Sequence, residues 1–223
     1  MERRMIQEIK DKESFLSLIT ENFISTLTST ISEKGNAKIL LSGGSSPIEL
    51  YKIWSSLDLP WEKIHIGLVD ERFVDTSDIN SNELLIHKYL LKNKAKNACF
   101  VGMIHNLGDI LLNQEALEKI YQTFYNADYI LLGMGDDGHT ASIFPNDMNS
   151  QLAFETEMLT AVTNSPKHPQ RRLSCTPKMI QSSPQVVLMM AGEKKRKIFH
   201  NSKKQNLPIS KISKYIHKTF ILL

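Results

Sequence analysis

Short apolar runs alternate with longer amphipathic stretches along the chain. The first amphipathic stretch has apolar residues at helical spacing between Phe15 and Ile31, and Gly35 follows it as a typical helix C-cap residue. Spacing of this kind predicts helices at residues 12–34, 80–92, 115–125, 176–182 and 193–202. The apolar runs predict strands at residues 37–42, 64–71, 99–104, 128–133, 158–164, 185–192 and 218–223.

Strands that alternate with helices and are apolar along their length are typical of parallel sheets buried on both faces. The sequence therefore predicts an α/β fold: a single domain over residues 1–223, with a mostly parallel, Rossmann-like sheet and helices on both faces. Ligands of such sheets bind outside the carboxyl ends of the strands. The residues that follow each strand are therefore the first candidates for function.

The loop after the strand at residues 37–42 has the features of an anion-binding turn. Gly43 and Gly44 allow the backbone to approach a ligand closely, and the hydroxyl of Ser45 is an additional donor. Residues 46–49 match a capping box, which predicts a helix that begins at Pro47. Free N–H groups at that helix end would attract a phosphate group. A plain strand-to-helix turn is an equally good interpretation, because glycine-rich turns before helices are common.

Three charged residues, Asp70, Glu71 and Arg72, stand at the end of the next strand. Ionised groups at the end of a buried strand must be paired or face a cleft. The guanidinium of Arg72 matches phosphate or carboxylate oxygens, and Asp70 or Glu71 could orient it or contact a substrate. The alternative is a local ion pair at the rim of the sheet.

Residues 133–145, GMGDDGHTASIFP, contain three glycines spaced as in the GxGxxG dinucleotide-binding motif. Three features argue against a dinucleotide. Pro145 ends the following helix after about one and a half turns, no acid ends the next predicted strand, and Asp136 and Asp137 would repel a pyrophosphate. A Rossmann dehydrogenase is therefore the weaker alternative, and no cofactor is expected.

The same segment places His139 directly after Gly138 and two residues after Asp137. Imidazole has an ordinary pKa of about 6.5, so it can take a proton from water near pH 7, and an adjacent carboxylate can orient it. We therefore interpret His139 as a candidate catalytic base; the alternative is a structural histidine that caps the short helix. None of the other six histidines has the HxH or HExxH spacing of a metal site, so no metal is expected.

The loop after the strand at residues 158–164 adds Lys167 and Arg172, in a segment stiffened by prolines. Both cations are expected to reach over the carboxyl edge of the sheet, whereas Arg171 is expected to be solvated. The strand ends would thus contribute an anion-binding turn, an arginine, a histidine and two further cations. Together they predict a site for a small phosphorylated molecule, with a histidine for proton transfer.

Composition adds few constraints. No stretch of this 223-residue chain has the roughly 18 consecutive apolar residues of a membrane span, and the charged N-terminus lacks the apolar core of a signal peptide. The two cysteines, Cys99 and Cys175, have no neighbouring Cys or His that would form a metal motif. We expect a cytoplasmic protein with reduced thiols and no association with a membrane.

The net charge of +3 is unevenly distributed. Nine Lys and Arg residues follow Gly192 against one acid, Glu193, so this tail carries +8 and the rest of the chain −5. Such a tail could bind nucleic acid or attract an anionic substrate. We expect a solvated helix face with extended lysines instead, and no binding to nucleic acid.

The motifs LSGGSSP, VDERFV, GMGDDGHTASIFP and SPKHPQRRLSCT occur in this order along the chain. In order and spacing they resemble the signatures of the 6-phosphogluconolactonase family, within the glucosamine-6-phosphate isomerase/6-phosphogluconolactonase superfamily, over nearly the whole chain. The related glucosamine-6-phosphate deaminases typically read GHIAFNEP where this chain has GHTASIFP. A deaminase or another sugar-phosphate isomerase is thus the alternative. Two residues depart from the family pattern, His168 where proline is usual and Asn146 where glycine is usual.

The resemblance implies hydrolysis of 6-phospho-D-glucono-1,5-lactone to 6-phosphogluconate in the oxidative pentose phosphate pathway, without a cofactor. It implies that His139 is the general base, assisted by Asp137 and Arg72, and it adds Asp70 and Gly138 to the substrate site. The groups expected to bind phosphate or polarise the lactone are Gly43, Gly44, Ser45, Arg72, Lys167 and Arg172. The expected partner is a small phosphorylated sugar lactone, and the chain is expected to be a monomer or a weak homodimer.

Overall fold

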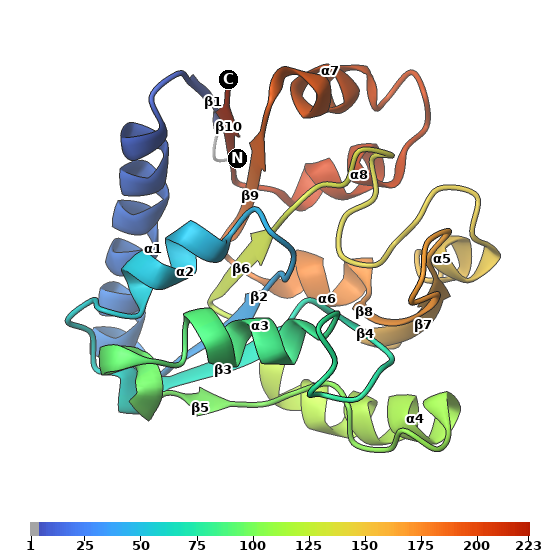
Figure 1. The fold of residues 1–223 in the computed structure, drawn as a ribbon, viewed down its shortest axis with the longest axis horizontal. Helices are drawn as coiled ribbons and strands as arrows, with labels where there is room; N and C mark the ends of the chain where they lie inside the picture. The colour runs from blue at the N-terminus through green and yellow to red at the C-terminus, as the bar shows by residue number, and fades with distance from the viewer. Residues whose placement is uncertain (1–4) are drawn as a thin grey trace.

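The central element of this computed structural model, which describes residues 5–223, is a seven-stranded sheet (Figure 1). Every neighbouring pair of strands in it is parallel. In spatial order the strands are β1 (Met5–Ile9), β10 (Lys218–Leu222), β9 (Val186–Ala191), β6 (Tyr129–Leu132), β2 (Ala37–Leu41), β3 (Ile64–Leu68) and β5 (Cys99–Phe100). The predicted parallel α/β fold is therefore confirmed, and the edge strand β1 is an element that the sequence pattern missed.

Helices lie on both faces of this sheet (Figure 1). The α-helices within residues 5–223 are α1 (Lys12–Lys34), α2 (Ile48–Trp54), α3 (Asn82–Tyr89), α4 (Ile110–Tyr121), α5 (Met148–Leu152), α6 (Pro177–Ser182), α7 (Glu193–Asn201) and α8 (Pro208–Ile212). The predicted C-cap of α1 is present, since Gly35 adopts φ 81°, and at the other end the Asp11 carboxylate, a cap that was not predicted, accepts from Ser14 N. Helix α4 begins earlier than predicted because the Asp109 side chain caps its first turn.

The core joins α1 and α2 to the middle of the sheet. Phe23 of α1 stacks on Trp54 of α2 with ring centroids 3.6 Å apart, and the edge of Tyr129 from β6 packs on the same pair. All three side chains are fully buried. Burial of such large aromatic rings is a major source of stability, and it fixes the strands whose carboxyl ends carry the candidate site.

A second, three-stranded antiparallel sheet was not predicted. It contains β4 (Asp70–Arg72), β8 (Arg171–Cys175) and β7 (Thr160–Asn164), in the order β4-β8-β7. The expectation that residues 64–71 form one strand is wrong, because the chain leaves the parallel sheet after Leu68 and Asp70 pairs with Ser174 instead. The strand predicted at residues 158–164 also belongs to this second sheet. Lys167 therefore lies in the turn between two antiparallel strands, and Arg172 lies within β8 opposite Arg72.

Two predicted helix starts are also wrong. Helix α2 begins at Ile48, and its N-cap residue, Pro47, has no side-chain acceptor to cap it. Glu49, the acid of the expected capping box, forms an ion pair of 2.5 Å with Lys12. No helix follows His139. Residues 140–143 form a tight turn instead, closed by a bridge between Thr140 and Ile143, in which Ala141 has a φ of 52° that a right-handed helix cannot contain.

Glu71 attaches β4 to the first turn of α3. Its fully buried carboxylate accepts hydrogen bonds from Asn82 N (2.8 Å), Glu83 N (2.8 Å) and Ser81 Oγ (3.1 Å). Burial raises the pKa of Glu71 to about 7, against the opposing effect of its bonds to backbone N–H groups, including that of Arg72. This contact fixes the backbone of β4 relative to the start of α3.

We expect Glu71→Ala to lower the free energy of unfolding by about 1–3 kcal/mol, because buried backbone donors at the start of α3 lose their acceptor. Urea unfolding followed by circular dichroism measures this change. Glu62→Ala, at an exposed position, is the control and should stay close to wild type. Equal stability of the two variants would contradict the assigned role of Glu71.

Candidate active site

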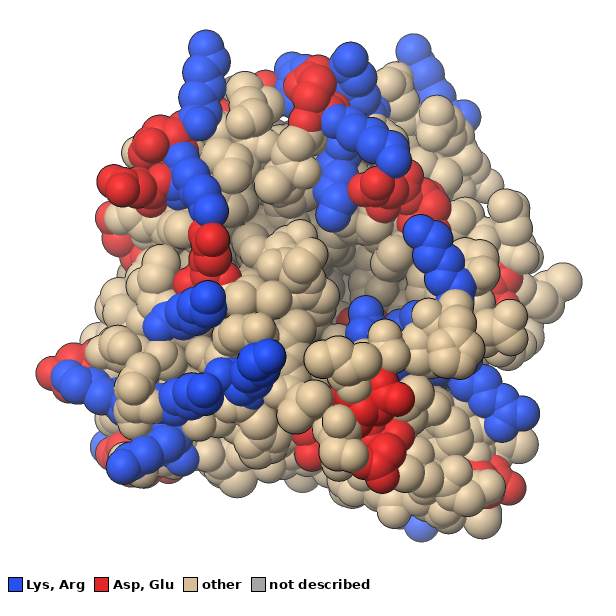
Figure 2. All heavy atoms as spheres, in the orientation of Figure 1, with Lys and Arg blue, Asp and Glu red and all other residues tan. Residues whose placement is uncertain are grey.

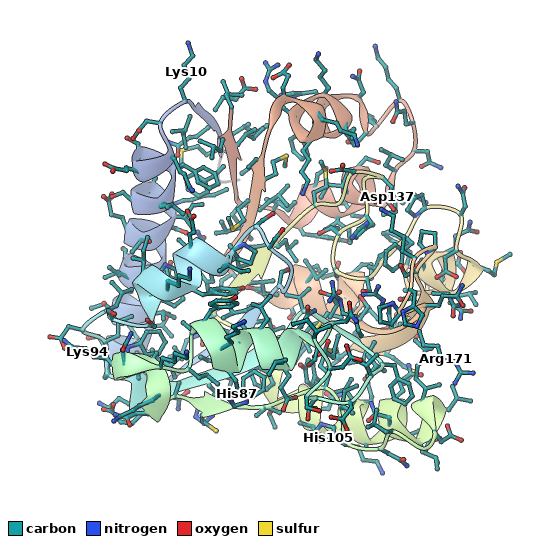
Figure 3. The ribbon with its side chains drawn as sticks, viewed as in Figure 1. Lys10, His87, Lys94, His105, Asp137 and Arg171 are labelled. Carbon is teal, nitrogen blue, oxygen red and sulfur yellow. The ribbon has the colours of Figure 1, made fainter. Side chains whose placement is uncertain are left out.

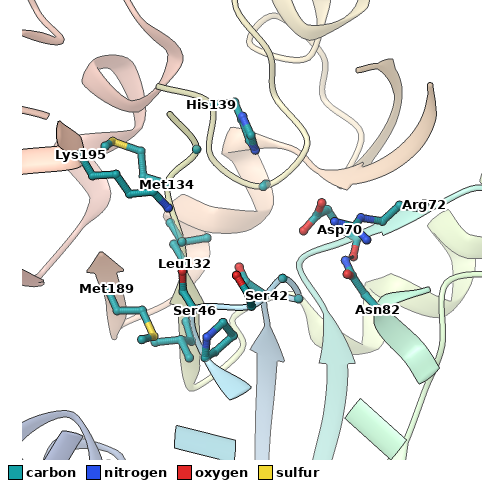
Figure 4. A pocket seen from close by; sticks show the side chains of 18 residues that line it. Ser42, Ser46, Asp70, Arg72, Asn82, Leu132, Met134, His139, Met189 and Lys195 are labelled. Carbon is teal, nitrogen blue, oxygen red and sulfur yellow. Dashed lines mark hydrogen bonds between the residues drawn. The ribbon is translucent and has the colours of Figure 1, made fainter. Parts of the chain in front are cut away.

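A cavity of about 210 Å³ opens beside the carboxyl ends of β2, β6 and β9 (Figure 4). The space-filling view shows it as a hollow bordered by basic and acidic side chains (Figure 2). Six residues predicted for the site line it: Gly43, Gly44, Ser45, Asp70, Arg72 and His139. The fold therefore brings together residues that are far apart in the sequence, as expected for residues that follow the strands. Four others, Asp137, Gly138, Lys167 and Arg172, lie outside the lining.

The imidazole of His139 is held from several sides. Its Nδ1 is 2.5 Å from Oδ1 of Asp137, and its ring packs at 4.6 Å from the ring of Phe144. Gly135 lies against the imidazole so closely that a Cβ there would be 2.1 Å from the ring atom Cε1. A neutral imidazole that donates Nδ1–H to Asp137 keeps its lone pair on Nε2. This arrangement gives His139 a proton-accepting atom with a fixed orientation.

The pKa of Asp137 is lowered overall. Burial raises it, but the hydrogen bonds and the charge of His139 have the larger combined effect in the opposite direction. An ionised carboxylate therefore faces Nδ1. It orients the imidazole and would stabilise a positive charge on the ring.

Ser142 connects the histidine loop to the second sheet. Its Oγ donates to Oδ2 of Asp70 at 2.6 Å, its N donates to Ser174 Oγ at 3.1 Å, and its carbonyl oxygen accepts from Thr163 Oγ1 at 2.6 Å. All four side chains are buried. Three strands of the second sheet thus hold one residue of the loop, and Asp70, which lines the cavity, accepts the hydrogen bond from Ser142.

Arg72 and Arg172 are neighbours on adjacent antiparallel strands. Arg72 lines the cavity and donates from Nη1 to Asn80 O at 2.5 Å. Arg172 lies behind it, donates from Nε to Pro169 O at 2.9 Å and sits over the Phe144 ring at 5.9 Å. Burial, and next the charge of Arg72, lower the pKa of Arg172. Arg172 therefore supports the wall next to His139, and its predicted contact with a substrate stays a prediction.

Two other predicted site residues have structural surroundings. Gly138 adopts φ 78°, which favours glycine, and its carbonyl oxygen accepts from Ile209 N at 3.1 Å. Lys167 is exposed in the turn between β7 and β8, and its charge acts on Asp136. Both help to shape the region around the cavity without lining it.

Lys195 is a cavity residue that the sequence analysis missed. The sequence pattern predicts a solvated basic helix face, and Lys195 is partly buried at the cavity. The signal was present, because Lys195 follows the carboxyl end of β9 in the first turn of α7. Its neighbours fit the original expectation better: Lys194 pairs with Asp136 on the surface, and Arg196 pairs with Glu8. Asn82, buried at the start of α3, also lines the cavity and was not predicted.

Within residues 5–223, no group of three or more His, Cys, Asp and Glu side chains is arranged to hold a metal ion. Across the same residues, no helix is both long enough and apolar enough to span a membrane. Both cysteines are free, Cys99 exposed and Cys175 buried.

The fold and the site define an α/β protein with an oriented imidazole in a cavity that also carries two cations, Arg72 and Lys195. Comparison with known proteins names the group. A model of the family of glucosamine-6-phosphate isomerases and 6-phosphogluconolactonase matches residues 10–221, and the chain belongs to this family.

Named relatives are similar over most of their length. A 6-phosphogluconolactonase of Neisseria meningitidis is 37% identical over 177 residues, which cover 78% of this chain and 77% of that protein. A 6-phosphogluconolactonase of Helicobacter pylori is 34% identical over 215 residues, covering 94% and 92%. The crystal structure of a 6-phosphogluconolactonase from Shewanella baltica superposes with a TM-score of 0.91 at 26% identity, covering 98% of each chain.

We expect Gly135→Ala to displace the His139 imidazole, because the added Cβ would lie 2.1 Å from Cε1 and 2.2 Å from Nδ1. The low-field proton NMR signal of Nδ1–H, hydrogen-bonded to Asp137, should shift or disappear. Gly133→Ala is a matched control in the same loop, since nothing lies within 4 Å of a Cβ at that position. An unchanged signal in Gly135→Ala would contradict the described packing.

Proposed function

We propose that the chain hydrolyses 6-phospho-D-glucono-1,5-lactone to 6-phosphogluconate, with His139 as the general base. The observation that carries this proposal is the pair of His139 and Asp137 at 2.5 Å, beside a cavity lined by Arg72 and Lys195. The relatives named 6-phosphogluconolactonase support the choice of substrate. An oriented base next to positive charge suits hydrolysis of an anionic lactone.

The substrate phosphate binds between the glycine turn and Lys195. Both line the cavity, and Gly44 adopts φ 83°, a backbone conformation that favours glycine and exposes peptide groups to a ligand. The ammonium group of Lys195 supplies a charge for the phosphate dianion. Arg72, on the other side of the cavity (Figure 4), adds a second positive charge for the substrate.

Hydrolysis begins when Nε2 of His139 accepts a proton from a water molecule. The water oxygen attacks the lactone carbonyl carbon, and the carbonyl oxygen becomes the anionic oxygen of a tetrahedral intermediate. Collapse of this intermediate breaks the bond between that carbon and the ring oxygen, which takes the proton back as the new hydroxyl group. Asp137 stabilises the protonated imidazole between these two transfers.

The same proposal includes several further properties. The enzyme would act in the oxidative pentose phosphate pathway, in the cytoplasm, as a monomer or weak homodimer, and without nucleic acid or a cofactor. Glucosamine-6-phosphate deaminase activity is the alternative within the family. Turnover of the phospholactone, and of glucosamine 6-phosphate in a parallel assay, distinguishes the two activities.

We expect His139→Ala to reduce the rate of phospholactone hydrolysis by about 10²–10⁴-fold, because the proton acceptor is lost. The lactone is generated in situ, and its disappearance is followed against the spontaneous background. His105→Ala is the control, since His105 lies well away from Asp137 (Figure 3). Wild-type activity of a folded His139→Ala protein would contradict the role of the base.

We expect Lys195→Ala to raise KM about 10- to 100-fold while kcat changes much less, because a charge-assisted contact to phosphate is worth roughly 1.5–3 kcal/mol. Steady-state kinetics with the same lactone assay separates the two constants. Lys203→Ala removes an exposed lysine of the same tail and should leave KM unchanged. A Lys195→Ala enzyme that loses only kcat would contradict the assignment to phosphate binding.

A further inference from the structure

Asp136 is an exposed acid with three lysines around it. Its Oδ2 lies 2.7 Å from Nζ of Lys194, and both side chains are more than half exposed. The hydrogen bond from Lys194 lowers the pKa of Asp136, and the charges of Lys195 and Lys167 act in the same direction. One carboxylate therefore interacts electrostatically with three lysines, which come from two separate parts of the chain.

The lysines of α7 stand at an unfavourable place for positive charge. Lys194 and Lys195 are in the first turn of α7, where the positive end of the helix dipole repels cations. The acid of that turn, Glu193, lies 3.2 Å from Arg196 Nη1. Asp136 is the negative charge that faces Lys194 from the neighbouring loop. It thus balances a positive field that exists next to the cavity.

The sequence neighbours of this ion pair line the cavity. Gly135, the residue before Asp136, and Lys195, the residue after Lys194, both line it. Asp137, not Asp136, holds the imidazole of His139. The carboxylate of Asp136 is therefore placed to influence a bound anion without contact to the base.

We propose that Asp136 is an internal counter-ion of the cations that attract the substrate phosphate, and that it sets the affinity of the site for anionic ligands. The identity of the ligand, a sugar phosphate, rests on the proposed function. The negative charge of Asp136 offsets part of the attraction that Lys194, Lys195 and Lys167 exert on an incoming phosphate. Asp136 thereby weakens the binding of substrate, product and inorganic phosphate alike, which favours release of the product.

The test compares Asp136→Asn with wild type. The substitution keeps the shape of the side chain and removes its charge, so the field at the phosphate becomes more positive. We expect KM for the phospholactone and the inhibition constant of inorganic phosphate to fall about two- to tenfold, with kcat nearly unchanged. At about 1 M salt the Debye length is only about 3 Å, so the difference from wild type should vanish.

Lys194→Gln separates this proposal from a mechanical role of the ion pair. If Asp136 and Lys194 act through their charges, the lysine variant raises KM and the phosphate inhibition constant, opposite to Asp136→Asn. If the pair instead closes the cavity as a latch, both substitutions break it and shift KM in the same direction. A shift in the same direction would overturn the proposal, as would an unchanged inhibition constant in Asp136→Asn.

Asp58→Asn is the matched control. Asp58 is an exposed aspartate that pairs with a lysine, Lys94, at 2.9 Å, and neither residue lines the cavity. Its substitution should leave both constants unchanged. Binding of inorganic phosphate is also measured by calorimetry, which needs no turnover. Absence of lactone hydrolysis in wild type would refute the proposed function, whereas the calorimetric comparison would still decide the role of Asp136.

Discussion

The buried hydrogen bond from Ser142 Oγ to Asp70 Oδ2, 2.6 Å long, joins the two parts of the site. One part is the loop after β6, which carries His139 and Asp137. The other is the second sheet, which carries Arg72. Buried polar contacts of this kind are costly when one partner is missing, so they specify a single arrangement. The relative position of the base and the arginine depends on this contact, and the further bonds of Ser142 to Ser174 and Thr163 reinforce it.

Positive charge is distributed around the cavity in two ways. Arg72 lines the cavity, and Arg172 lies behind it on the adjacent strand. The nearby acids Asp70 and Glu71 offset part of the repulsion between the two arginines. Lys195 reaches the cavity from the first turn of α7 and is partly buried, like Arg72. A cavity with a cation on each side suits an anionic ligand. The dense positive charge also explains why acids such as Asp136 accompany it.

The sequence was informative where structure depends on local pattern. Apolar runs predicted the strands of the parallel sheet except β1, and the strand-end rule identified His139, Arg72 and the glycine turn as neighbours. The sequence pattern was not informative where a secondary-structure element depends on a contact with residues distant in the sequence. Strand β4 has only three residues and exists because β8 pairs with it, so nothing within residues 64–72 distinguishes it from the end of β3. Lys195 was overlooked because a lysine-rich helix usually faces solvent, although its position after β9 carried the signal.

The most direct test of the account is a crystal structure with the product 6-phosphogluconate bound. We expect its phosphate between the glycine turn and Lys195, and its carboxylate carbon about 3–4 Å from a site that a water held by His139 Nε2 would occupy. That orientation would place the bond to be hydrolysed at the base and the phosphate at the lysine. A carboxylate at Lys195 with the phosphate beside His139, or binding outside this cavity, would contradict the account.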